Sequence, residues 1–168
     1  VISITITRLG PLPPRIKDVG VVVDLASHDI DIIRFLTKSG FRKVHSMVTG
    51  GLSDGREDTA LLSFERENGV LCHINTNWLT PFKARELNVA AREKYIKGWL
   101  IEQRVSEYEA HSDGSYTVRD MQVPYGEPLK LEIQAFVNAI AENKEPPVTG
   151  EDGFKALEIA LECLRREQ

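Results

Sequence analysis

The sequence lacks most features that would identify a secreted, membrane or nucleic-acid-binding protein. It has only two cysteines, Cys72 and Cys163, and their separation matches neither a metal-binding nor a redox spacing. No apolar run reaches the roughly 18 residues of a transmembrane helix, and a net charge of −4 offers no basic stripe for nucleic acid. No G-x-G-x-x-G follows a predicted strand, and no phosphate loop is present. We therefore expect a cytoplasmic protein without membrane or nucleic-acid partners and without a cofactor site in these residues.

The residues that are present indicate one domain spanning residues 1–168. A chain of this length can bury about 70% of its unfolded surface in a single core. Its 42% hydrophobic and 27% charged residues are ordinary for a globular protein. It opens on Val1–Arg8, where apolar and polar residues alternate as in a half-buried strand. Because this pattern begins at the first residue, without an initiator methionine, we expect the chain to be part of a longer protein.

The predicted elements follow the order strand, helix, a run of strands and then two helices. A proline-dense loop, Gly10–Arg15, separates the first strand from the first helix. From Pro128 onward the apolar residues recur at helical spacing, and Thr149 with Asp152 forms a capping box for a closing helix. Strands followed by helices predict an α+β fold, with an open, mostly antiparallel sheet and helices on one face. Further strands are expected at residues 41–49, 58–65, 70–78, 84–95, 100–110 and 116–123, with Pro81 as an interruption.

The first predicted helix carries the candidate acid–base residues. Asp24, His28 and Asp31 are spaced at i, i+4 and i+7, which places them on one helix face. An imidazole can hold or release a proton near neutral pH, and a carboxylate one turn away can raise its pKa and orient it. The same spacing also fits an ordinary helix start, where an aspartate interacts with the helix dipole. Spacing alone leaves both interpretations open. The residues expected to seat the helix on the core are Leu25, Ile32 or Ile33, and Leu36.

A second candidate cluster consists of Trp78, Lys83 and Arg85. An exposed aromatic ring beside two cations would bind a sugar ring or an anionic phosphate. The alternative is a core tryptophan with solvated cations at a strand edge. Arg15, in the proline loop, is either a similar anion contact or a surface charge.

A metal site is a weaker alternative for the same helix. Asp24 and His28 would supply two ligands, with His45 or His73 as a third. The sequence contains no H-E-x-x-H, and both additional histidines lie in predicted strands, where cross-strand packing explains them. We therefore expect no bound metal.

Three segments of the chain resemble one protein family. Asp24–Arg34 resembles the D-x-x-x-H-x-x-D segment of the glucose–fructose oxidoreductase/inositol dehydrogenase/MocA family. Arg8–Pro11 with Asp18–Val21 resembles the family's approach to that segment, and Pro147–Leu157 resembles its closing stretch. Within the family, the nearest likeness is to nucleotide-sugar dehydrogenases, such as those acting at C3 of a UDP-N-acetylglucosamine-type sugar. Gly98–Leu100 departs from the more acidic, tyrosine-bearing segment of close relatives, which leaves the substrate open.

The resemblance implies an α+β substrate domain that follows an N-terminal Rossmann domain binding NAD(P). In the family the open sheet of this domain often forms the dimer contact. The resemblance also implies that Asp24 and His28 belong to the active site, whereas a lysine from an E-K-P motif comes from the first domain. Neither E-K-P nor a glycine-rich loop occurs in these residues. Trp78, Lys83 and Arg85 would lie in a substrate-facing stretch.

The favoured function is therefore the substrate-binding half of an NAD(P)-dependent oxidoreductase acting on a secondary hydroxyl of a sugar or nucleotide sugar. His28 would be the general acid/base, and Asp24 would orient it or bind a substrate hydroxyl. Without a Rossmann domain, we expect the chain to be inactive for hydride transfer. Its expected partners are that domain, the sugar and a second copy bound through the sheet. The alternatives are a non-catalytic dimerisation or ligand-binding module and a metal-dependent hydrolase using Asp24 and His28.

Overall fold

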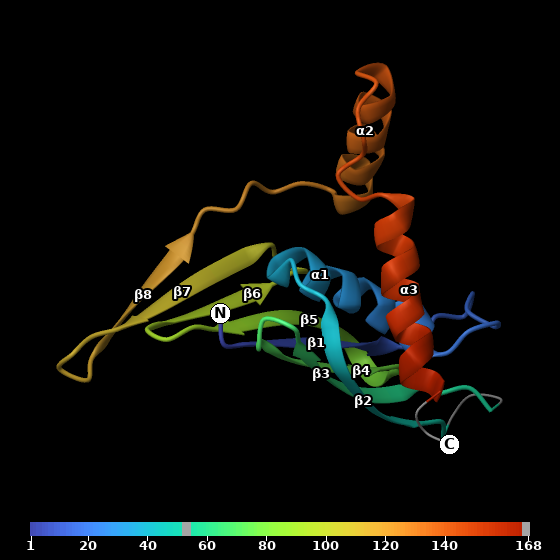
Figure 1. The fold of residues 1–168 in the computed structure, drawn as a ribbon, viewed down its shortest axis with the longest axis horizontal. Coiled ribbons are helices and arrows are strands. Elements are labelled where there is room, and N and C mark those ends of the chain that lie inside the picture. The colour runs from blue at the N-terminus through green and yellow to red at the C-terminus, as the bar shows by residue number, and fades with distance from the viewer. Residues whose placement is uncertain (52–54, 166–168) are drawn as a thin grey trace.

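The protein, seen in a computed structural model that describes residues 1–51 and 55–165, is built on one open sheet (Figure 1). Eight strands pair in the order β2-β3-β4-β1-β5-β6-β7-β8. All neighbouring strands are antiparallel except β1 and β4, which run parallel. The strands are β1 (Ser3–Pro11), β2 (Phe41–Thr49), β3 (Thr59–Arg66), β4 (Leu71–Asn77), β5 (Leu79–Ala90), β6 (Lys94–Trp99), β7 (Arg104–Ala110) and β8 (Tyr116–Met121).

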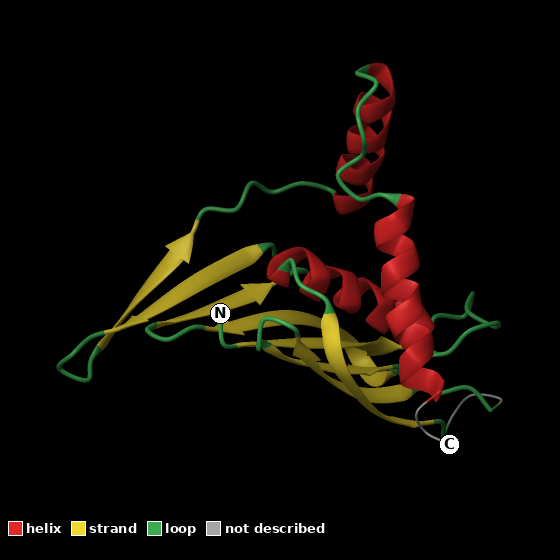
Figure 2. Ribbon diagram, viewed as in Figure 1, coloured by secondary structure: helices red, strands yellow, loops and turns green. Residues whose placement is uncertain are grey.

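The helices cover one face of the sheet and leave the other face open (Figure 2). A short π-helix, η1 (Val22–Ala26), continues directly into α1 (Ser27–Thr37), and α3 (Gly150–Arg165) packs against both. The remaining helix, α2 (Pro128–Ala141), stands away from the sheet. Across the two described ranges, no helix is both long enough and apolar enough to cross a membrane.

The core lies between these helices and strands β1 to β4. In β1 the even-numbered residues are buried, so Ile4 and Ile6 face the helices. Val22, Ile30 and Ile33 are fully buried on the opposing helix layer. Small side chains on α3 let that helix approach closely, and the buried ones are Ala156, Ala160 and Cys163.

The α+β class and the open, mostly antiparallel sheet expected from the sequence are confirmed, but several boundaries were wrong. Residues 84–95 belong to two strands with a turn at 91–93, and the strand expected from residue 100 begins at Arg104. Pro81 does not interrupt the sheet, because it lies in a part of β5 that β6 does not pair with. On α1, Ile30 and Ile33 face the sheet, which turns Leu36 outward. The sequence also predicts a polar loop at residues 50–55, of which residues 52–54 lie outside the described residues.

Candidate active site

The start of the helix is held by Glu57, from the loop before β3. The Val21 N–H donates to the Glu57 backbone oxygen at 2.9 Å, and the Val22 N–H donates to its carboxylate at 3.1 Å. Gly20 leaves room for this carboxylate, because a Cβ at that position would lie 2.0 Å from it. A carboxylate at a helix N-terminus binds otherwise unpaired N–H groups and interacts favourably with the helix dipole. Glu57 therefore fixes where the helix begins.

The predicted acid–base pair spans the junction between the π turn and the α-helix. Asp24 lies within η1, where the Ser27 N–H donates to the Val22 oxygen five residues earlier. The Ser27 hydroxyl also donates to the Val23 oxygen at 2.7 Å. His28 is the second residue of α1. Such π turns are rare and occur frequently at functional sites.

Asp24 and His28 are available to a ligand, whereas Asp31 is not. Asp24 is half-buried and His28 is exposed. Within the described residues, neither side chain forms a hydrogen bond or ion pair. Asp31 instead accepts from Arg34 at 2.9 Å, and Arg34 also donates to the Asp152 backbone oxygen at 2.8 Å. Asp31 is thus part of the link between α1 and α3.

Asp29 forms a buried ion pair that the sequence interpretation missed. Arg8 donates from Nε to both Asp29 oxygens at 2.9 Å and from Nη2 to Oδ1 at 2.6 Å. Asp29 is 0% exposed and Arg8 is 7% exposed. Burial raises the pKa of the Asp29 carboxyl, and the hydrogen bond and charge of Arg8 oppose that rise. The strand alternation contained a signal for this pair, because Arg8 continues the buried row of Ile4 and Ile6.

Two of the predicted substrate-binding cations lie beside this pair. Arg85 is directly opposite Arg8 in the β1–β5 register and is exposed. Partial burial lowers the pKa of Arg85, as does the charge of Arg8, while Asp29 opposes the change. Lys83 is exposed and its side chain lies next to Gly10 of β1. Cations therefore line the helix side of β5 beside β1 and its Arg8–Asp29 pair.

The structure places Trp78 apart from this group. Trp78 was considered as an exposed stacking platform, but it is 3% exposed and belongs to the core. Its backbone N–H donates to the Asp58 backbone oxygen at 2.9 Å. Of the two interpretations left open by the sequence, the core tryptophan holds and the exposed ring does not. Arg15 is exposed in the loop that joins β1 to η1.

The histidines considered as metal ligands lie on the opposite side of the sheet from Asp24 and His28. His45 and His73 flank Ser63 across β2, β3 and β4, and Ser63 contacts His73 Nδ1 at 3.1 Å. Their neighbours Val44, Phe64 and Cys72 point to the core, so the histidines point to the open face. In the part of the chain that the structure describes, no three His, Cys, Asp or Glu side chains are grouped to hold a metal ion.

The open, mostly antiparallel sheet with helices on one face is the architecture of the C-terminal domain in a two-domain class of oxidoreductases. The model of the GFO/IDH/MocA C-terminal domain matches residues 5–97, more than half of the chain. The chain belongs to this family.

Individual relatives share the fold at low sequence identity. UDP-N-acetylglucosamine 3-dehydrogenase of Acidithiobacillus ferrooxidans is 26% identical over 160 residues, covering 92% of this chain and 51% of the relative. Its solved structure superposes with a TM-score of 0.87, 23% identity and coverage of 95% and 52%. Inositol 2-dehydrogenase 2 of Saccharopolyspora erythraea is 27% identical over 95% of this chain and 48% of the relative. Levoglucosan dehydrogenase in complex with NADH and L-sorbose gives a TM-score of 0.82 at 18% identity, with coverage of 99% and 57%. The chain thus spans about half the length of these relatives.

Proposed function

We propose that this chain is the substrate-binding and proton-transferring half of an NAD(P)-dependent oxidoreductase that acts on a secondary hydroxyl of a sugar or nucleotide sugar. The observation that carries the proposal is the pair of free side chains, Asp24 and His28, at the start of a helix whose neighbouring carboxylate is fully paired. Side chains without internal partners can bind a substrate without first breaking a bond. Family membership and the activities of the named relatives support the same reaction class.

His28 is the proton acceptor in this proposal. Oxidation of a secondary alcohol requires its hydroxyl proton to leave as the carbonyl forms, and a neutral imidazole is suited to accept it near pH 7. In the reverse direction the imidazolium returns the proton. Asp24 binds an adjacent hydroxyl or orients the imidazole, since a carboxylate accepts hydrogen bonds from either.

Lys83 and Arg85 give the site a preference for an anionic group. Both cations are exposed on the helix side of β5, next to β1, whose Arg8 pairs with the Asp29 carboxylate. Guanidinium and ammonium groups are the usual partners of phosphate oxygens. This placement supports a nucleotide sugar, whose diphosphate would contact the two cations while the sugar ring reaches His28. The activity of the Acidithiobacillus relative is consistent with that substrate class.

The residues described here do not form a dinucleotide site, because no strand is followed by a glycine-rich loop and helix. We assign the cofactor to an N-terminal half, and we expect these residues alone not to turn over substrate. The surface of α2 supports such a partner. Its large apolar side chains are between 50% and 66% exposed, although a helix of about 12–15 residues is marginal in water by itself. These side chains are Leu129, Leu131, Ile133, Phe136, Val137 and Ile140.

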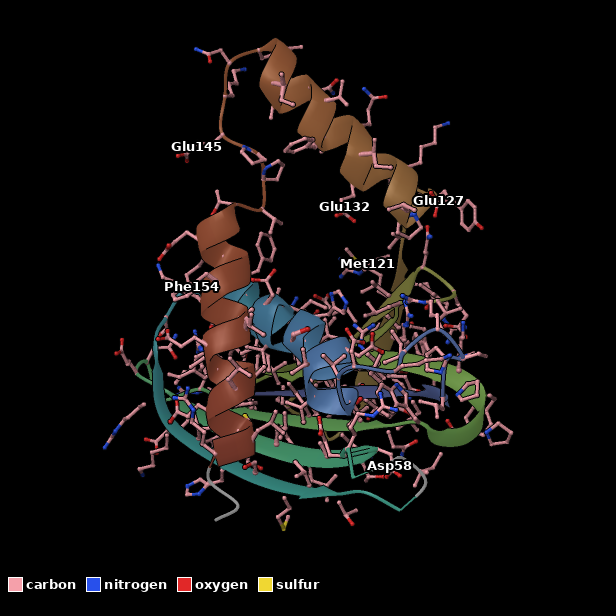
Figure 3. The ribbon with its side chains drawn as sticks, turned by 90° about the vertical axis from the view of Figure 1, so that its right-hand side faces the viewer. Asp58, Met121, Glu127, Glu132, Glu145 and Phe154 are labelled. Carbon is pink, nitrogen blue, oxygen red and sulfur yellow. The ribbon has the colours of Figure 1, made fainter. Side chains whose placement is uncertain are left out.

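Exposed apolar side chains continue beyond α2. Figure 3 shows α2 standing clear of the rest of the molecule, above Phe154 of α3 and Met121 of β8. Phe154 is 61% exposed and Met121 is 45% exposed. We propose that the N-terminal half covers these surfaces. Hydrogen exchange tests this: the α2 amides should exchange more slowly in the complete protein than in residues 1–168 alone, and equal rates would contradict the docking.

The catalytic proposal is tested by replacing His28 in the complete protein. With NAD⁺ and either UDP-N-acetylglucosamine or scyllo-inositol, His28→Ala should lower kcat by about 10²–10⁴-fold, as expected for loss of a general base. His111→Ala is the matched control, because His111 contacts Thr117 in the exposed turn between β7 and β8. Unchanged turnover in His28→Ala would exclude the proposed role.

The open face of the sheet favours a second, compatible function as a dimerisation module. Tyr95, Tyr108 and Tyr116 form a row of ring contacts there, with centroids 6.2 and 6.3 Å apart. Val118 and Leu71 are also exposed on this face. Aromatic and apolar side chains on one sheet face are typical of a protein interface. We propose that two copies associate through this face.

A further inference from the structure

A forked ion pair ties the first turn of α1 to β1. Arg8 binds both oxygens of Asp29 through two nitrogens, and both side chains lie in the core layer. The planar guanidinium fork fixes direction as well as distance. Asp29 is covalently adjacent to His28, so the pair holds the backbone that carries the imidazole.

Two anchors therefore bracket the acid–base residues. Glu57 holds the backbone N–H groups of Val21 and Val22, and Asp29 is held by Arg8. Asp24 and the whole π turn lie between these points. A π turn has less regular hydrogen bonding than an α turn, so it persists where the surrounding structure fixes both of its ends.

We infer that Arg8 and Asp29 are positioning residues that hold the π turn and the imidazole of His28 in the orientation needed for proton transfer. This inference rests on the function proposed above. A buried ion pair is a weak source of net stability, because an apolar pair of similar volume often stabilises a fold equally well. An apolar pair lacks the directional contact between guanidinium and carboxylate. The inferred contribution of Arg8 and Asp29 is therefore to the orientation of the helix backbone.

The kinetic test uses the complete protein with UDP-N-acetylglucosamine and NAD⁺. Arg8→Met/Asp29→Leu should keep a urea midpoint close to wild type. It should lower kcat by about 10–100-fold, because a displacement near 1 Å is costly for catalysis, and change KM by less than about threefold. Arg8→Lys keeps the charge without the fork and should give an intermediate kcat. Ile30→Val is the control: it should lower the urea midpoint but not kcat, because Ile30 is a buried core residue beside Asp29.

Wild-type kcat in either folded Arg8 variant would overturn the inference while leaving the role of His28 intact. Wild-type turnover in His28→Ala would instead overturn the proposed function and the inference together.

Native-state hydrogen exchange provides a readout independent of activity. In the double variant the amides of residues 24–29 should exchange faster, while those of β3 keep their wild-type rates, because the change is local to the π turn. Unchanged exchange at residues 24–29 would show that the pair does not order this turn and would overturn the inference.

Discussion

The effect of Gly20→Ala on the free energy of unfolding should change sign when Glu57 is removed. A Cβ at Gly20 would lie 2.0 Å from the Glu57 carboxylate. That carboxylate accepts the Val22 N–H at 3.1 Å, so Gly20→Ala must displace it from the helix N-terminus. The backbone at Gly20 is not in the left-handed region, so alanine itself is permitted there. The whole cost of Gly20→Ala should therefore come from the lost cap.

The expected free energies follow from these two effects. Losing a capping acceptor costs about 0.5–2 kcal/mol. Replacing glycine by alanine at a permitted backbone conformation stabilises by about 0.4–1 kcal/mol, because it restricts the unfolded chain. In the wild type, Gly20→Ala should destabilise by up to about 1.5 kcal/mol, the cap loss reduced by the entropy gain. In a Glu57→Ala background the cap is already absent, and Gly20→Ala should stabilise by about 0.4–1 kcal/mol.

The assay is a double-mutant cycle measured by urea unfolding. Trp78 is buried beneath the helices and reports the transition by fluorescence. The coupling energy should be close to the cost of Glu57→Ala alone, since both changes remove the same cap. An equal effect of Gly20→Ala in both backgrounds would refute the steric coupling between these residues.

Three further perturbations test other parts of the structure. Arg8→Met should lower the free energy of unfolding by about 3–5 kcal/mol in urea, because it leaves the fully buried Asp29 carboxylate unpaired. The double variant Arg8→Met/Asp29→Leu should recover most of this loss. Additive effects of the two substitutions would contradict the pairing. Thr149 lowers the pKa of Asp152 to about 2 from 3.8, so this carboxylate contributes stability above pH 4 that is lost as the pH falls from about 4 to 2. Asp152→Asn should remove that acid-side dependence from the urea midpoint, and an unchanged pH profile would contradict it. Tyr116→Lys should shift sedimentation of the complete protein toward the monomer if the open face forms the dimer, whereas an unchanged distribution would place the contact elsewhere.

The sequence predicted the fold because each pattern was local. Alternation of apolar and polar residues predicted β1, and the Thr149–Asp152 capping box predicted the start of α3. There the Asp152 N–H donates to the Thr149 hydroxyl and the Thr149 N–H donates to the Asp152 carboxylate. The contacts of the candidate site are not local. Arg8 and Asp29 are 21 residues apart, and Glu57 lies 35 residues beyond Val22. A single sequence carries no distance information at such separations, so it could not show which carboxylate on the helix was paired and which was free.

The difference between the paired and the free carboxylate can be related to the position of the helix on the sheet. Helices η1, α1 and α3 cover the half formed by β1 to β4, whereas on the helix side of β5 to β8 residues such as Ile96 and Met121 remain exposed. Arg8 belongs to β1 and Arg85 to β5, the strand at the edge of the covered half, where Leu87 and Val89 still pack against the core. The acid–base helix therefore borders the uncovered half. We expect a substrate or second domain placed over β6 to β8 to approach this helix from the side. The Arg8–Asp29 pair lies on the covered side of this boundary, and the proposed site beside it would be completed by another part of the protein.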